Sequence, residues 1–208
     1  MVEVIQANEL SLHQVNQKFN LQEVQDLQFF PEWQEGLVEP TEAEKQWLDR
    51  VKTDFLFLLE YPLHEEVVKM AVLALLLSLG GFFHYPFYPK AEAEIRITVL
   101  DEGEVVRGKI DLLILGQNLW VVVIESKNRQ FSVDEALPQA LSYMMGSPDP
   151  QKPVFGLATN GSHLIFIKLF TKEMPRYALS DEFSLRRRGN ELYDVLSILR
   201  RLGEIVTL

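Results

Sequence analysis

The chain has 208 residues, of which 47% are hydrophobic and 24% are charged, a composition typical of globular proteins. It contains no cysteine, which excludes disulfides and thiolate metal sites, and we see no membrane-spanning run or signal peptide, so we expect a cytoplasmic protein. Its net charge of −10 repels nucleic acid at long range, so any affinity for DNA must come from local basic groups.

Residues 1–62 are expected to form an N-terminal arm and a helical extension. Residues 1–40 are polar and interrupted by prolines, which predicts one short helix capped by Ser11 and then an irregular arm. Three aromatic residues of the arm are expected to pin it to the rest of the protein: Phe29, Phe30 and Trp33.

Thr41 and Glu44 have the spacing of a capping box, which predicts a helix from there to about Glu60. Four apolar residues at helical spacing are expected to form its buried face: Trp47, Val51, Phe55 and Leu58. Pro62 ends this helix, and residues 63–208 are expected to form the main domain.

The next predicted helix covers Leu63–Leu79, because Gly80 and Gly81 end its apolar pattern. It begins with Glu65 and Glu66. Each can face inward at the start of the helix, and each also favours the positive end of the helix dipole without any further role.

Alternating apolar residues predict a strand over Glu94–Leu100. Two apolar runs joined by Gly116-Gln117-Asn118 then predict a β-hairpin within residues 108–127. Together these segments form an antiparallel meander. Asp111 interrupts the first apolar run of the hairpin, whereas Glu125 and Lys127 end the second.

The length of the hairpin loop decides whether Asp111 and Glu125 share a face. With a loop of Gly116–Asn118, Asp111 lies opposite Val123, and Glu125 is its diagonal neighbour on that face. If Gln117 and Asn118 alone form the loop, Asp111 turns away from Glu125. Isolated carboxylates are costly in buried strands, so we expect the longer loop, or a bulge with the same effect, and a divalent cation between the two carboxylates.

A helix over Asp134–Met145 follows the hairpin and carries Gln139 and Tyr143 on one face, at i and i+4. This helix supplies the crossover that lets Val154–Ala158 pair in parallel with the strand of Glu125. A second hairpin pairs that strand with His163–Phe170. A short extended piece near residues 177–180 and a helix from about Asn190 to Leu202 complete the chain.

Asp111 followed by Glu125-Ser126-Lys127 resembles the D…(D/E)-x-K core of the PD-(D/E)XK nucleases. Gln139-x-x-x-Tyr143 resembles the Q-x-x-x-Y motif of the nuclease domain at the N-terminus of type I restriction enzyme R subunits. Thr159-Asn160-Gly161 before an apolar strand is a further, weaker similarity. The resemblance covers roughly residues 63–169. Ile110 stands where the Pro that gives the family its name would be, and no G-x-x-x-x-G-K-[ST] motif of a motor occurs in the sequence.

The resemblance implies an α/β (α+β) protein with a restriction-endonuclease-like core, in which helices flank a central mixed sheet. It also implies Mg²⁺, replaceable by Mn²⁺, held by Asp111, Glu125 and the main-chain carbonyl of Ser126. Lys127 would orient the attacking water, and Gln139 and Tyr143 would support the site. A helix carboxylate would assist, for which we favour Glu65 over Glu66. The number of metals stays open.

DNA is therefore the expected substrate, with restriction-modification or motor subunits as candidate partners. The expected basic contacts are Arg129 beside the site and the cluster Arg186, Arg187 and Arg188, although solvated charges explain that cluster equally well. The alternative is a non-catalytic nuclease-fold module that binds protein or nucleic acid and uses Asp111, Glu125 and Lys127 as an ion-paired cluster. A homo-oligomer is compatible with either function.

Overall fold

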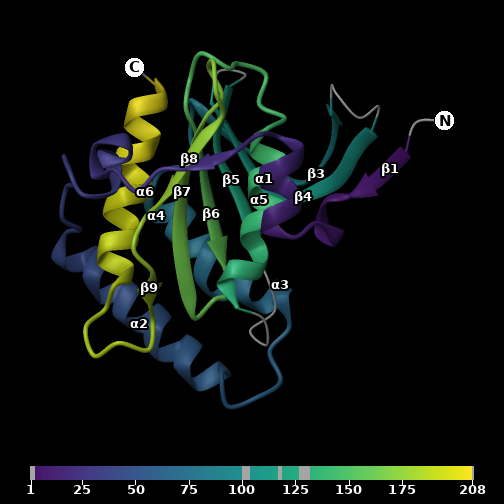
Figure 1. Cartoon of the computed structure of the whole chain (residues 1–208). Helices are drawn as coiled ribbons and strands as arrows, with labels where there is room; N and C mark the ends of the chain where they lie inside the picture. Colours follow the sequence, from purple (N-terminus) through teal and green to yellow (C-terminus); the bar gives the residue numbers. More distant parts are fainter. Residues whose placement is uncertain (1–2, 100–103, 117–118, 127–131, 208) are drawn as a thin grey trace.

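The computed structural model describes residues 3–99, 104–116, 119–126 and 132–207; for residues 3, 65, 99, 119–126 and 207 we consider the backbone alone. The described strands form one mixed sheet with helices on both faces (Figure 1). The predicted α/β class with a mixed central sheet is therefore confirmed. No helix within these ranges combines the length and the apolar character needed to cross a membrane.

The main path of the sheet contains seven strands, with two more attached to it. Along this path the order is β1 (Glu3–Gln6), β4 (Glu104–Gly116), β5 (Leu119–Ser126), β6 (Val154–Thr159), β7 (His163–Phe170), β8 (Arg176–Leu179) and β2 (Gln22–Glu23). In addition, β3 (Phe87–Val99) pairs with β4, and β9 (Phe183–Ser184) pairs with β7. The predicted antiparallel meander is present as β3, β4 and β5, and β5 pairs in parallel with β6 as expected.

Two apolar cores lie on opposite faces of the sheet. One joins the sheet to α2 (Glu42–Leu58), η4 (Lys69–Leu73), α4 (Ala74–Leu79) and α6 (Leu192–Thr207), together with α3 (Glu65–Val68) and η3 (Pro31–Trp33). The other joins it to α1 (Leu12–Lys18), η5 (Val133–Ala136) and α5 (Leu137–Met144), with η1 (Ala7–Glu9) beside them. Figure 1 shows α2 and α6 on one side of the sheet and α1 and α5 on the other. One more short turn, η2 (Leu27–Phe29), lies in the N-terminal segment.

The N-terminal segment is more ordered than its sequence predicts. Ser11 caps α1 as expected, and Phe30 is buried and stacks on Phe155, with ring centroids 6.0 Å apart, so the prediction that aromatics pin this segment is confirmed for Phe30. The irregular arm, however, contains β2, and β1 precedes α1. These strands pair with β8 and β4, so residues before α2 belong to the same sheet as the later strands.

Helix α2 begins at the predicted capping box of Thr41 and Glu44. Val51 and Phe55 of its predicted apolar face are buried, and Leu58 packs against the same core. The prediction was wrong for Trp47, which is 52% exposed, while its neighbour Leu48 is fully buried. The predicted helix over residues 63–79 is present as α3, η4 and α4. Lys69 begins a π-helical turn in its middle, and such turns are frequent at functional sites.

The β4–β5 hairpin does not have the predicted three-residue loop. Gly116 pairs with Leu119, so Gly116 belongs to the strand. A register shift follows between Ile114 and Leu115, which is the bulge that the sequence left as the alternative. Strand β3 is also longer than expected, because it begins at Phe87 rather than at Glu94.

Candidate functional site

Strand β4 changes neighbour along its length, and this change forms a fork in the sheet. Its residues 104–107 pair with β1, whereas its residues 112–116 pair with β5. Strand β3 stays on its other side throughout. The residues between the two ladders, Gly108 to Asp111, are therefore the place where the sheet opens toward α5.

Tyr143 of α5 fills the fork. Its hydroxyl oxygen accepts hydrogen bonds from the backbone N–H of Lys109 (3.1 Å) and from Nε2 of Gln139 (2.9 Å). Both Tyr143 and Gln139 are buried. The tyrosine ring lies against Gly108, where a Cβ atom would come within 2.4 Å of the hydroxyl oxygen, so only glycine fits at this point of β4. The expected pair of α5 therefore faces the strand that contains Asp111.

Asp111 lies at the β5 side of the fork and is bonded to a lysine of the opposite helical layer. Nζ of Lys69 is 3.0 Å from Oδ1 of Asp111, and both side chains are largely buried, with exposed fractions of 31% and 20%. Ile110 belongs to the core on the α5 side of the sheet, whereas Leu112 packs on the core of the opposite side, so the alternation of side chains is interrupted here. The face shared by Asp111 and Glu125, expected from alternation, stays a prediction.

The remaining predicted site residues lie only partly within the described structure. The Leu112–Ile124 pair ends the β4–β5 ladder one residue before Asp111 and Glu125, and the backbones of Glu125 and Ser126 pair with β6. Glu65 begins α3, one turn before Lys69. The side chains of Glu65, Glu125 and Ser126, and all of Lys127 and Arg129, lie outside the described structure.

Two ion pairs lie at the fork, one between Glu92 and Lys109 and one between Lys69 and Asp111. Glu92 of β3 contacts Lys109, with Oε2 2.9 Å from Nζ. The hydrogen bond from Lys109 and its positive charge lower the pKa of Glu92, and the charge of Lys69 adds a smaller effect in the same direction. Lys69 in turn holds Asp111. The sequence analysis did not identify Lys69, Glu92 or Lys109 as site residues.

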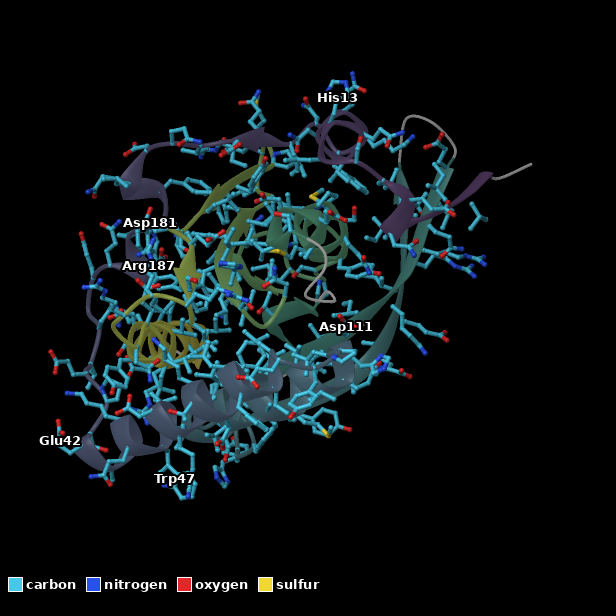
Figure 2. All side chains as sticks on the ribbon, turned by 90° about the horizontal axis from the view of Figure 1, so that it is seen from below. His13, Glu42, Trp47, Asp111, Asp181 and Arg187 are labelled. Carbon is cyan, nitrogen blue, oxygen red and sulfur yellow. The ribbon has the colours of Figure 1, made fainter. Side chains whose placement is uncertain are left out.

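The arginine cluster 186–188 lies at a different part of the sheet. It follows β9, which pairs with β7, and two strands separate β7 from β4. Neighbouring strands are about 4.8 Å apart, so this separation is about 14 Å. Figure 2 shows Arg187 beside α6 and Asp111 on the side of the meander. All three arginines are exposed, and Arg187 is paired with Glu191 at 2.7 Å.

The chemistry of Asp111 fits a metal ligand. Its carboxylate already accepts a cation, the ammonium of Lys69, in a partly exposed position. Among the described side chains, no three acidic or histidine residues gather closely enough to hold a metal ion. The other predicted metal ligands are Glu125 and the carbonyl of Ser126. The side chain of Glu125 lies outside the described structure.

No protein-family model matches this chain, and no curated protein matches it. The resemblance to the nucleases therefore rests on the motif residues of the sequence alone.

Proposed function

We propose that this protein is a Mg²⁺-dependent endonuclease that hydrolyses phosphodiester bonds in DNA, with a restriction-endonuclease-like core resembling that of type I restriction R subunits. The observation that best supports this function is the register of the β4–β5 hairpin. Its Leu112–Ile124 pair is followed directly by Asp111 on one strand and Glu125 on the other. Two carboxylates on neighbouring strands suit Mg²⁺, which prefers oxygen ligands.

In this proposal Asp111, Glu125 and the carbonyl of Ser126 hold the metal, which would polarise the phosphate and acidify a bound water. Lys127 orients the attacking water and stabilises negative charge on the phosphate. Tyr143 and Gln139 keep the fork open, because the tyrosine hydroxyl accepts the N–H of Lys109 that a paired strand would otherwise take. The roles of Glu65 and Arg129 stay those expected from the sequence.

One observation favours the second candidate, a non-catalytic module that binds protein or nucleic acid. Asp111 is already neutralised by Lys69 at 3.0 Å, so the carboxylate has a partner within the protein. A module of this kind would keep the pair permanently, whereas the nuclease must release Asp111 to bind a metal. The two candidates therefore differ in whether Mg²⁺ or Mn²⁺ displaces Lys69 from Asp111.

The proposed function is tested by incubating the purified protein with single-stranded, double-stranded and branched DNA in Mg²⁺ or Mn²⁺. We expect cleavage by the wild type and none by Asp111→Ala or Lys127→Ala. Matched controls are Asp54→Ala and Lys172→Ala, which remove exposed charges far from the fork in sequence and should cut like the wild type. If the wild type cuts none of these substrates, alone or with restriction or motor subunits encoded beside it, the non-catalytic candidate replaces the nuclease.

A further inference from the structure

Two arginines face each other across β3 and β4. Arg96 and Arg107 are direct partners in the antiparallel register, and Gln6 of β1 is the partner of Arg107 on its other side. Like charges directly opposite each other destabilise a pair of strands. This arrangement therefore costs the protein stability unless an anion lies between or above the two guanidinium groups.

The described part of the chain provides no such anion. None of its carboxylates lies within 4.0 Å of either guanidinium group, and the buried Nε atom of Arg107 has no hydrogen-bond acceptor there. Lys109, on the same face of β4, differs because it is bonded to Glu92 and lies opposite Glu94 in the register. The positive charge of Lys109 is thus compensated within the protein, whereas no described carboxylate compensates the arginine pair.

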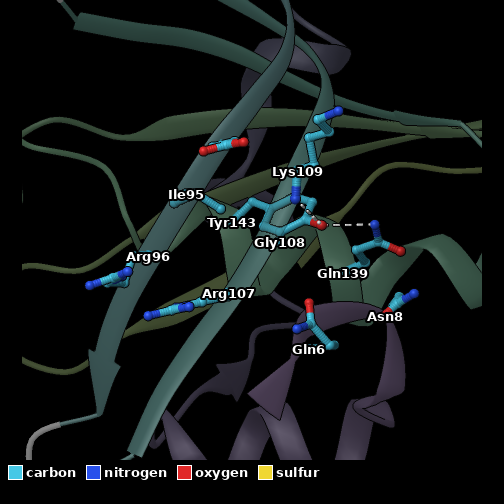
Figure 3. Close-up of a pocket in the computed structure, with 10 residues that line it drawn as sticks. Gln6, Asn8, Ile95, Arg96, Arg107, Gly108, Lys109, Gln139 and Tyr143 are labelled. Carbon is cyan, nitrogen blue, oxygen red and sulfur yellow. Dashed lines mark hydrogen bonds between the residues drawn. The ribbon is translucent and has the colours of Figure 1, made fainter. Parts of the chain in front are cut away.

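The arginine pair lines the pocket at the fork. This pocket has a volume of about 630 Å³, and its polar lining includes Arg96, Arg107, Gln6, Asn8, Gln139 and Tyr143. Glu94 is an acid in the lining, and its register partner is Lys109. Figure 3 shows the two arginine side chains extending in the same direction from neighbouring strands, with Gln6 and Asn8 beside the hydrogen-bonded pair of Gln139 and Tyr143. In this view both arginine side chains extend away from Gln139, Gln6 and Asn8. The two neighbouring guanidinium groups are by themselves suited to oxygen anions.

We infer that the Arg96–Arg107 pair binds phosphate groups of a nucleic-acid backbone and guides the strand toward Asp111. The choice of nucleic acid rests on the proposed function, whereas the anion chemistry rests on the arginine pair alone. Arg107 and Asp111 are four residues apart on β4, about 13 Å, and the phosphates of one strand recur about every 3.4 Å along the helix axis. A strand bound at both points would span about four nucleotides.

The inference is tested by fluorescence anisotropy with labelled duplex DNA in the presence of EDTA, over a series of salt concentrations. Binding without metal separates this test from cleavage at Asp111. We expect Arg96→Ala and Arg107→Ala each to weaken binding about fivefold and to flatten the dependence of log K on log salt by about one unit. The matched control is Arg50→Ala, which removes an exposed arginine of α2 and should bind like the wild type.

Two further measurements distinguish a loss of DNA binding from a loss of folding, and a nucleic-acid site from a site for a small anion. Because each substitution removes a like-charge contact, the melting temperature of either variant without ligand should equal or exceed that of the wild type. Inorganic pyrophosphate serves as a probe for a small anion. Wild-type protein that is stabilised by pyrophosphate but does not bind DNA would overturn the assignment to a nucleic-acid backbone.

A double variant, R96A/R107A, that binds DNA with wild-type affinity and salt dependence would overturn the inference completely. Protein that binds DNA through these arginines but cuts none with Mg²⁺ or Mn²⁺ would support the inference while removing the proposed nuclease function.

Discussion

Lys69 and Asp111 connect the helical layer to the fork in the sheet, with 3.0 Å between Nζ and Oδ1. The lysine begins the π-helical turn, which changes the direction in which the following residues leave the helix. Because the ammonium group occupies a carboxylate that the proposed function assigns to a metal, Lys69 and a divalent cation must compete for Asp111. This competition gives a prediction that differs between the two candidate functions.

We predict that Lys69→Met raises the affinity for Mn²⁺, because methionine keeps the apolar stem and removes the competing charge. An ion pair of this exposure contributes about 1 kcal/mol, which corresponds to about a fivefold change in affinity. Calorimetric titration of the wild type, Lys69→Met and Asp111→Asn measures the effect, with Lys172→Met as the control. Equal Mn²⁺ affinity in all four proteins would mean that Asp111 is no metal ligand, and would favour the non-catalytic module.

Gly108 and Tyr143 give a second prediction. A methyl group at residue 108 would lie 2.4 Å from the hydroxyl oxygen of Tyr143, so Gly108→Ala should displace the ring and free the N–H of Lys109. We expect a loss of about 1–3 kcal/mol in the free energy of unfolding, measured with urea. Gly189→Ala, where the new methyl group meets nothing within 4 Å, is the control.

The cause of this loss is tested by making Gly108→Ala also in a protein that carries Tyr143→Ala. If the clash with the tyrosine causes the loss, Gly108→Ala should cost little in a protein that already lacks the ring, because the two residues act on one contact. An equal loss in both backgrounds would show that the glycine is required for another reason.

The sequence predicted the elements that have clear periodicity, and missed contacts that depend on register. The meander, the parallel β5–β6 pair and the capping box of α2 follow from apolar patterns and cap residues. Strands β1 and β2 are too short to show a period. The beginning of β3 was missed because Pro89 interrupts a segment that otherwise alternates poorly.

The charged residues of the fork show the same limit more clearly. Lys69 meets Asp111 across 42 residues of sequence, and no local pattern connects them. Arg96 and Arg107 become opposite residues only once the register of β3 and β4 is known. The polar alternation of Glu94, Arg96 and Thr98 was visible, but the three-residue turn expected at 101–103 would have placed Arg96 opposite Gly108, one residue away from its partner Arg107.

Glu44 gives a prediction on the dependence of stability on pH. Arg200 of α6 donates hydrogen bonds to both oxygens of this carboxylate, and the backbone N–H of Thr41 donates another at 2.8 Å. These hydrogen bonds, above all those from Arg200, lower the pKa of Glu44 from 4.5 to about 2. Since the folded pKa is the lower one, this stabilisation is complete above pH 4.5 and is lost as the pH falls toward 2.

We therefore expect Glu44→Gln to lower the free energy of unfolding by about 2 kcal/mol at pH 7, after allowance for solvent screening. The difference from the wild type should shrink between pH 4.5 and pH 2. Urea unfolding at a series of pH values measures this, with Glu60→Gln as an exposed control. A constant difference over the whole range would show that packing, and not the ion pair with Arg200, joins α2 to α6.

Gly161 lies in the turn between β6 and β7, and its backbone φ of +81° is one that residues with side chains rarely adopt. A Cβ atom here would also come within 2.6 Å of Cγ1 of Val68 and 2.9 Å of Cζ of Phe55. We predict that Gly161→Ala lowers the free energy of unfolding by about 2–4 kcal/mol through strain and overpacking together. Gly81→Ala separates the two causes, because Gly81 has a φ of +85° but nothing within 4 Å of the added methyl group.

Val68 directly precedes Lys69, so Gly161→Ala should also change Mn²⁺ affinity if Lys69 competes for Asp111. A loss no larger than that of Gly81→Ala would show that the β6–β7 turn does not fix the position of the helix that contains Lys69.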